Sequence, residues 1–138
     1  MSTGLQVVGG AVSIGGRKLS VSRAIRAGDF VFLAGQIPLR NDEVVTEGSI
    51  EEQTRIVLDL IKSTLAEAGC ALEDVVKSMV WLRDRADFPG FNDVYGEYFP
   101  AAPPTRSAVV SDLLVDVRVE VEVVAYRPAG VEQGPAKP

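Results

Sequence analysis

The sequence predicts an α+β domain in which a single mixed β-sheet carries two helices on one of its faces. Three segments support this prediction. Residues 117–125 alternate apolar and charged side chains with the period of a strand. Residues 49–69 and 87–99 instead repeat their apolar side chains at helical spacing. Strand-like segments before and between these helices complete an order that is typical of helices packed on a sheet.

The N-terminal part of the chain predicts the first strands. Residues 1–18 alternate apolar and glycine-containing pieces, which indicates an edge strand or a hairpin. Residues 21–26 and 30–34 are strand-like, and Ala27-Gly28-Asp29 between them is a turn sequence. A polar loop over residues 39–48 then leads to the first helix.

The first helix has a recognisable beginning and end. Ser49 and Glu52 form the pattern of a capping box, in which each side chain accepts a hydrogen bond from the other residue's backbone amide. Gly69 supplies the stop, because glycine readily adopts the left-handed backbone that ends many helices. The side chains at helical spacing are Val57, Ile61, Leu65 and Ala68.

A strand over residues 75–83 and a second helix follow. Asp87 is expected to cap this helix, and Pro100 to end it. Its large side chains are Phe88, Phe91, Tyr95 and Phe99. We expect one domain over residues 1–127 and a disordered Gly- and Pro-rich tail over residues 128–138.

The last two strands carry the first candidate site. Pro103-Pro104 cannot extend a helix, so Thr105 and Arg106 open a strand. With only the short link 111–116 before the next strand, we expect the two strands to pair antiparallel. That pairing would bring the Arg106 guanidinium near a carboxylate. A fork that binds anions beside a group that moves protons is the start of an active site.

One face of the predicted sheet has no cover within a single chain. In the last strand Val117, Val119, Val121 and Val123 would face the helices, which leaves Arg118, Glu120 and Glu122 on the other side. The uncovered face also carries apolar side chains such as Val109 and Val124. Because such a mixture is more typical of an interface than of a wet exterior, we expect the chain to self-associate.

The composition is that of a compact soluble domain. Its 138 residues can bury a core without metal or disulfide staples. The formal charge of −5, with scattered basic residues, argues against a nucleic-acid partner. No apolar stretch has membrane-spanning length, and the N-terminus lacks the layout of a secretory signal. The lone Cys70 cannot form an intrachain disulfide, so we expect a cytoplasmic protein and interpret Cys70 as a packing residue.

The absence of histidine restricts the chemistry. Without it there is no Ser-His-Asp triad, Cys-His pair or His-bound metal. Gly9-Gly10 and Gly15-Gly16 match neither a phosphate loop nor a dinucleotide fingerprint, so we interpret them as turns. We therefore expect no metal and no nucleotide cofactor. The groups that remain for chemistry are carboxylates, Arg106, tyrosines, hydroxyls and the backbone.

A series of short motifs is spread along the chain from about Val21 to Tyr126. In order these motifs are Gly35-Gln36-Ile37-Pro38, Glu52-Gln53-Thr54, Ala68-Gly69, Asp74-Val75-Val76-Lys77, Asp87-Phe88, Asn92-Asp93-Val94-Tyr95, Pro104-Thr105-Arg106 and Val119-Glu120-Val121-Glu122. The full series resembles the Rid/YjgF family of small imine deaminases. Older names for that family are endoribonuclease L-PSP and translation-inhibitor protein.

The resemblance implies both an assembly and an activity. It implies a chorismate-mutase-like, YjgF-like fold and a trimeric barrel with ligand clefts between subunits. It also implies a cofactor-independent RidA-like deaminase that converts an imine or enamine bearing a carboxylate to a keto acid and ammonium. In the family, the arginine that matches Arg106 binds the carboxylate, a role that suits its two-pronged donor. Glu120 would orient or deprotonate water; its other interpretation is an interface salt bridge, and for Glu122 we expect only a structural role.

Three further residues are candidates for the cleft. Asn92 and Tyr95 are three apart on the second predicted helix and share a face. The resemblance places the matching residues near the ligand, whereas the alternative is a core tyrosine and an asparagine that ties down a loop. Gly35 either leaves room for a ligand against the backbone or makes a tight bend.

The chain departs from the imine-deaminase branch at three cleft positions. Val21 replaces a tyrosine, Ala34 a serine and Ala108 a cysteine. These changes either weaken activity on small imino acids or redirect it to ligands that are more apolar near the tail. Two other functions stay open: a deaminase of a larger, aminomuconate-like catabolic acid, and a non-catalytic trimer that binds small molecules or acts like a chaperone.

Overall fold

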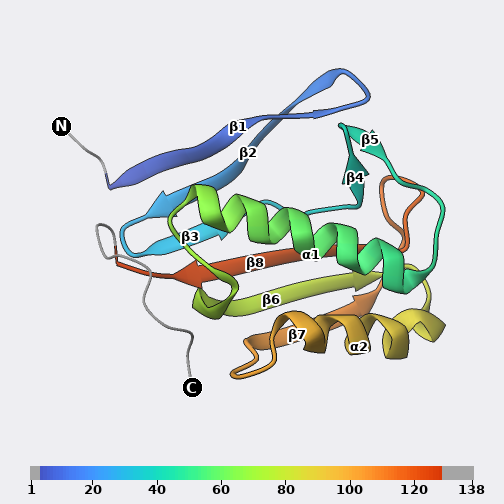
Figure 1. Ribbon diagram of the computed structural model, residues 1–138. Helices are drawn as coiled ribbons and strands as arrows, with labels where there is room; N and C mark the ends of the chain where they lie inside the picture. The colour runs from blue at the N-terminus through green and yellow to red at the C-terminus, as the bar shows by residue number, and fades with distance from the viewer. Residues whose placement is uncertain (1–3, 129–138) are drawn as a thin grey trace.

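The computed structural model of this protein describes residues 4–128 (Figure 1). The tail predicted to be disordered, 128–138, lies outside the described residues except for Pro128. The elements are β1 (Leu5–Ile14), β2 (Arg17–Ala27), β3 (Phe30–Leu33), β4 (Leu39–Arg40), β5 (Glu43–Val44), α1 (Ile50–Glu67), β6 (Val75–Leu82), α2 (Phe88–Tyr98), β7 (Thr105–Val110) and β8 (Val119–Tyr126). Short 3₁₀ turns at Leu72–Asp74 and Arg85–Asp87 precede β6 and α2. Within the described range, no helix is long and apolar enough to cross a membrane.

A six-stranded sheet is the centre of the fold, with the strand order β1-β2-β3-β8-β6-β7. The β6–β7 pair is parallel and the other neighbours are antiparallel, so the sheet is mixed. Helices α1 and α2 lie side by side over one face of this sheet (Figure 1). The predicted fold class is therefore confirmed. The predicted polar loop contains one further feature, the small β4–β5 hairpin.

The predicted pairing of the last two strands is wrong, because β6 lies between β7 and β8. Arg106 of β7 is in register with Ser78 of β6, and Ser78 is in register with Val123 of β8. The physical reason is the crossover made by α2. Parallel neighbours need a connection of a dozen or more residues, usually helical, and the segment from β6 to β7 supplies one. The short link after β7 then leads past β6 rather than making a hairpin.

The core lies between the helices and the inner face of the sheet. Val119, Val121 and Val123 are buried there against α1 and α2, as their alternation predicts. The other face of the sheet keeps large side chains exposed: Phe30, Phe32 and Tyr126 remain more than 40% accessible, and the rings of Phe30 and Tyr126 are 5.1 Å apart. This apolar outer face is the surface that the sequence predicts to be an interface.

The two helices begin differently. At α1 the capping box is confirmed: the Glu52 amide donates to the Ser49 hydroxyl, and the Ser49 amide donates to the Glu52 carboxylate, each over 3.1 Å. At α2 Asp87 occupies the N-cap position, but its side chain caps no amide. The Asp87 carboxylate instead accepts from Arg118 at 3.2 Å, and Asp84 caps the preceding turn. The prediction that the Asp87 side chain caps α2 is therefore wrong. Arg118, which is distant in sequence, lies close enough to take this carboxylate as its partner.

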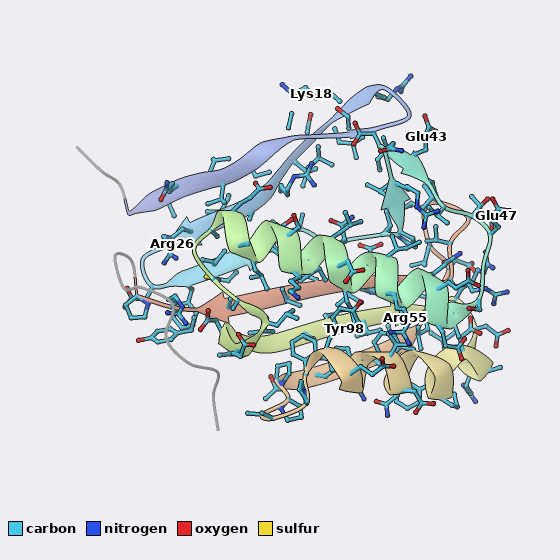
Figure 2. The ribbon with its side chains drawn as sticks, viewed as in Figure 1. Lys18, Arg26, Glu43, Glu47, Arg55 and Tyr98 are labelled. Carbon is cyan, nitrogen blue, oxygen red and sulfur yellow. The ribbon has the colours of Figure 1, made fainter. Side chains whose placement is uncertain are left out.

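Polar contacts fasten α1 to α2 on the outside of the fold. The Arg55 guanidinium donates to both carboxylate oxygens of Glu97, each over 3.0 Å, and the Tyr98 hydroxyl donates to Asp59 over 2.7 Å. Figure 2 shows Arg55 and Tyr98 between the two helices. Burial, together with the hydrogen bond to Asp59, raises the pKa of Tyr98 to about 12, so its hydroxyl keeps its proton at physiological pH.

The β1–β2 hairpin contains both of the glycine pairs noted in the sequence. Gly15-Gly16 forms its turn, as predicted, with positive φ at both residues. Gly9-Gly10 is not a turn but lies inside β1, where the register with β2 shifts between Val8 and Ala11. Gly9 has a φ of +82°, so the extra residue of this bulge takes a backbone that other residues rarely adopt.

Two glycines of α2 predict opposite effects of the same substitution. A methyl group at Gly96 would meet nothing within 4 Å, whereas at Gly90 it would lie 2.8 Å from Ile50 Cγ2 and 2.5 Å from a Glu51 carboxylate oxygen. Gly96→Ala should therefore stabilise the fold by roughly 0.5–1 kcal/mol through lower backbone entropy of the unfolded chain. Gly90→Ala should destabilise it by about 1–3 kcal/mol through overpacking. Urea unfolding of the two variants measures both effects. If Gly90→Ala stabilises the fold, then Ile50 and Glu51 of α1 move aside without loss of stability, and the overpacking prediction is wrong.

Candidate functional site

Arg106 lies on the edge strand β7 and points toward α2. Its Nη1 donates to Oδ1 of Asn92 over 2.9 Å. The guanidinium carbon lies 4.8 Å from the centre of the Tyr95 ring and 5.4 Å from that of Phe88. Within the described residues, no other group of this chain hydrogen-bonds to the guanidinium. Aromatic faces and one amide thus hold the side chain while its remaining donors stay available to an anion.

The two predicted helix residues both belong to this support. Tyr95 is 4% exposed, packs against Phe91 and Phe99, and donates its hydroxyl to the buried Ser78 over 2.8 Å. Burial raises the pKa of Tyr95, so its hydroxyl stays protonated. The side chain of Asn92 accepts from Arg106 and, within residues 4–128, makes no hydrogen bond to a loop. A cavity of about 410 Å³ opens beside this group, lined by Asn92, Tyr95, Gly96, Phe99, Pro103, Pro104 and Arg106.

Glu120 lies in a second cavity, of about 560 Å³. Within the described residues its carboxylate has no hydrogen bond or ion pair. Burial, and to a smaller extent the negative charge of Glu122, raises the pKa of Glu120 above the ordinary value of 4.5. A carboxyl group of raised pKa can both accept and return a proton closer to neutral pH.

Gly35 makes the position of Glu120 possible. A side chain at Gly35 would place its Cβ 2.1 Å from Oε2 of Glu120. Gly35 follows β3, and the neighbouring Gln36 pairs with Val121 of β8, so this backbone passes directly beside the carboxylate. The group that lies against the Gly35 backbone is thus the Glu120 carboxylate, and room for a ligand at Gly35 stays a prediction.

Of the three positions that depart from the imine-deaminase branch, two line the Glu120 cavity and one does not. Val21 and Ala34 line the Glu120 cavity, so two of the expected cleft residues lie beside Glu120. Ala108 lies on β7 in register with Val80, and it lines neither the Glu120 cavity nor the Arg106 cavity.

Arg106 and Glu120 do not meet within one chain, which corrects the expectation drawn from strand pairing. Arg106 points to the helix side of the sheet, whereas Glu120 alternates with the buried Val119 and Val121 and points to the other side. Arg106 is level with Ser78 and Glu120 with Trp81, with β6 between them. Two strand spacings and three residues separate their Cα atoms by roughly 14 Å. One small ligand cannot contact both side chains of the same chain.

Sequence reasoning missed most of the Glu120 cavity. Its walls include side chains from β1, from β2 and from the loop before β8. The residues that were not anticipated are Val12, Ile14, Arg17, Leu19, Arg23, Gln36, Ile37, Leu39, Leu114 and Val115. The Gly15-Gly16 turn indicated a hairpin, but nothing in the local sequence indicates that this hairpin would reach the carboxylate.

Other candidate groups carry no site. Cys70 is buried, as its interpretation as a packing residue requires, and burial raises the pKa of its thiol. Residues 4–128 contain no group of three or more Cys, Asp or Glu side chains arranged to hold a metal ion.

Comparison with known proteins gives the family. The profile described as Endoribonuclease L-PSP matches residues 18–127. The chain belongs to this family. The resemblance to Rid/YjgF proteins is thereby confirmed, and β1 lies before the matched segment.

Individual family members extend the comparison. A RutC family protein of Pyrococcus horikoshii is 50% identical over 109 residues, which are 77% of this chain and 86% of that protein. The 3-aminoacrylate deaminase RutC of Acinetobacter baylyi is 42% identical over 105 residues, or 75% of this chain and 83% of that enzyme. The crystal structure of Escherichia coli TdcF with bound serine has a TM-score of 0.78 at 30% identity and covers 88% of this chain and 98% of TdcF.

Proposed function

We propose that this protein is a deaminase that hydrolyses an imine or enamine bearing a carboxylate to a keto acid and ammonium. Kinship with a 3-aminoacrylate deaminase supports this reaction class, and a serine-bound neighbour supports a small ligand with a carboxylate. The observation that carries the proposal is the pair of complementary groups. Within residues 4–128, Arg106 keeps guanidinium donors without a partner, and Glu120 is a carboxyl group of raised pKa that lies in a cavity without a hydrogen bond or ion pair.

The proposal includes a second copy of the chain. Because Arg106 and Glu120 lie on opposite sides of one sheet, a complete site needs Arg106 from one subunit and Glu120 from its neighbour. A cyclic homotrimer would supply three such sites, and the exposed aromatic face of the sheet supports association of this kind. Asn92 and Tyr95 of α2 would then hold the Arg106 guanidinium in position, without touching the reacting atoms.

The reaction begins with water adding to an electrophilic carbon. Arg106 holds the carboxylate of the protonated imine with its two-pronged donor. Glu120, as carboxylate, takes a proton from water while the water oxygen bonds to the C=N carbon. The C=N electron pair moves to nitrogen, and a carbinolamine forms. Glu120 thus acts as the general base.

The second half returns the proton. The protonated Glu120 carboxyl gives its proton to the amino nitrogen, the C–N bond breaks, and ammonia leaves while the carbinol oxygen forms the C=O bond of the keto acid. Ammonia takes up the hydroxyl proton to become ammonium. With an enamine, the protonated carboxyl first places a proton on the β carbon to give the iminium form. A raised pKa suits Glu120 to both roles.

The test is turnover of freshly generated imines. An amino-acid oxidase supplies the imine, semicarbazide competes as a trap, and this protein should lower the yield of trapped product by hydrolysing the imine first. Sedimentation equilibrium of the same preparation should show a trimer at micromolar concentration. A panel of imines that all decay at their spontaneous rates would refute the deaminase. Saturable keto-acid binding in that case would identify a non-catalytic binder, and a monomer would refute the composite site.

A further inference from the structure

The β1–β2 hairpin forms one wall of the cavity that holds Glu120. Val12 and Ile14 of β1, with Arg17 and Leu19 of β2, line this wall. The tip of the hairpin is fixed, because the Gly15 amide donates to the Asp42 carbonyl between β4 and β5 over 2.9 Å. Figure 2 shows Lys18 of this hairpin and Glu43 of β5 at the same end of the molecule. The wall is therefore held in place by the small hairpin opposite it.

The lining of the cavity is mostly apolar. Its apolar residues come from the hairpin, from the segment after β3 and from the loop before β8: Val12, Ile14, Leu19, Val21, Ala34, Ile37, Leu39, Leu114 and Val115. Leu114 is fully exposed in the isolated chain, and Val21 is 45% exposed. Covering apolar surface of this kind with an apolar ligand group removes it from water, which favours binding. The cavity, about 560 Å³, also falls within the range of small-molecule sites.

The charged groups of the cavity restrict the ligand further. Besides Glu120, the charged residues of the lining are Arg17 and Arg23. A cationic side chain would lie beside Arg17 and Arg23, and an anionic one beside the Glu120 carboxylate, so a side chain of either sign would leave water for apolar walls with a like charge nearby. Val21 and Ala34 offer no hydroxyl or amide to a polar side chain, and the side-chain amide of Gln36 already donates to the Ile37 carbonyl over 2.8 Å. The lining therefore disfavours cationic and hydroxylated side chains and favours aliphatic or aromatic ones.

We propose that the β1–β2 hairpin is a specificity element that selects imines or enamines with a large, uncharged apolar side chain. This inference rests on the proposed deaminase function, since it describes the substrate of that same site. The selecting side chains are Val12 and Ile14. Both lie before residue 18, where the family match begins, so they belong to the part of this chain that the family pattern does not describe.

The test compares two imines that differ only in side chain, one derived from leucine and one from alanine. In the native protein kcat/KM for the leucine-derived imine should exceed that for the alanine-derived imine by about 10–100-fold, since each apolar group in a pocket contributes roughly this kind of discrimination. Val12→Ser and Ile14→Ser should each reduce this ratio by about tenfold. Ile14→Val, which keeps the wall apolar and folds with little perturbation, should give a ratio between native and Ile14→Ser.

The matched control is Val7→Ser, the same chemical change on the same strand. Val7 is 66% exposed and lies outside the cavity, so the ratio should be unchanged. A native ratio near one, or equal ratios in native protein and both serine variants, would overturn the inference while leaving the deaminase intact. If no imine is turned over, calorimetry compares the binding of 4-methyl-2-oxopentanoate with that of pyruvate. Tighter binding of the larger keto acid that is weakened by Ile14→Ser supports the selective wall. Equal affinities for the two keto acids overturn it.

Discussion

Arg106→Ala should bind 2-keto acids roughly 10–100-fold more weakly than the native protein. The guanidinium is held by Asn92 and the Tyr95 ring, with its remaining donors directed to a cavity. A charge-assisted hydrogen bond to a carboxylate contributes about 1.5–3 kcal/mol, which corresponds to the stated loss. Isothermal titration with pyruvate or a larger 2-keto acid measures it.

Three variants make this result specific. Arg106→Lys should recover only part of the affinity, because lysine keeps the charge and loses the planar fork. Asn92→Ala should weaken binding less than Arg106→Ala, since it frees the guanidinium without removing it. Arg55→Ala removes an arginine that pairs with Glu97 on the helix face and should bind normally. Native affinity in a trimeric Arg106→Ala variant would remove Arg106 from the site.

The local structure of this chain could be predicted from sequence because it depends on near neighbours. The Ser49–Glu52 capping box and the end of α1 near Gly69 require residues only a few positions apart. The inward face of β8 follows from strict alternation between Val119 and Val123. In each case a local geometric rule decides the conformation, so one sequence contains the necessary information.

Strand order could not be predicted in the same way. Two consecutive strands with a short link favour a hairpin, but α2 carries the chain to the far edge of β6 before β7 begins. This crossover places β6 between Arg106 and Glu120, and the register of Arg106 with the buried Ser78 puts Arg106 on the helix side of the sheet. The error therefore reached the site: two residues expected to meet in one chain lie on opposite faces of the sheet.

The cavity around Glu120 shows a second limit. Glu120 itself was anticipated from the family pattern, whereas the hairpin wall that contains Val12 and Ile14 was not. Those side chains are brought to the cavity of Glu120 by the pairing of β1 with β2 and by the hydrogen bond between Gly15 and Asp42. Long-range contacts of this kind leave no local signal in the sequence.

Glu120→Gln should lower turnover of imines by about 10²–10⁴-fold while leaving keto-acid binding and assembly unchanged. Glutamine fills the same space beside Gly35, but it cannot accept a proton from water. A role as an interface salt bridge predicts the reverse result, a loosened trimer with normal chemistry at each site. Imine decay in the semicarbazide assay, with sedimentation on the same sample, distinguishes the two roles.

The dependence of kcat/KM on pH tests the role of Glu120 as base independently. The base acts as carboxylate, so kcat/KM should fall as pH drops through the pKa of Glu120. Because burial and the charge of Glu122 raise that pKa, the acidic limb should lie above pH 4.5. Glu122→Gln is the matched control: it should keep turnover and move the limb to lower pH, since it removes one cause of the shift. If the acidic limb lies at the same pH in Glu122→Gln as in the native protein, the assignment of this limb to Glu120 is contradicted.

Mixed trimers test the same residue together with its partner subunit. Arg106→Ala and Glu120→Gln subunits should each be nearly inactive alone, because every cleft lacks one group. After the two variants are unfolded and refolded together in equal amounts, about a quarter of the clefts should combine a native Arg106 with a native Glu120 from the neighbour. Activity should then return to about a quarter of the native value. If the mixture is no more active than its components, the two residues do not act across a subunit boundary.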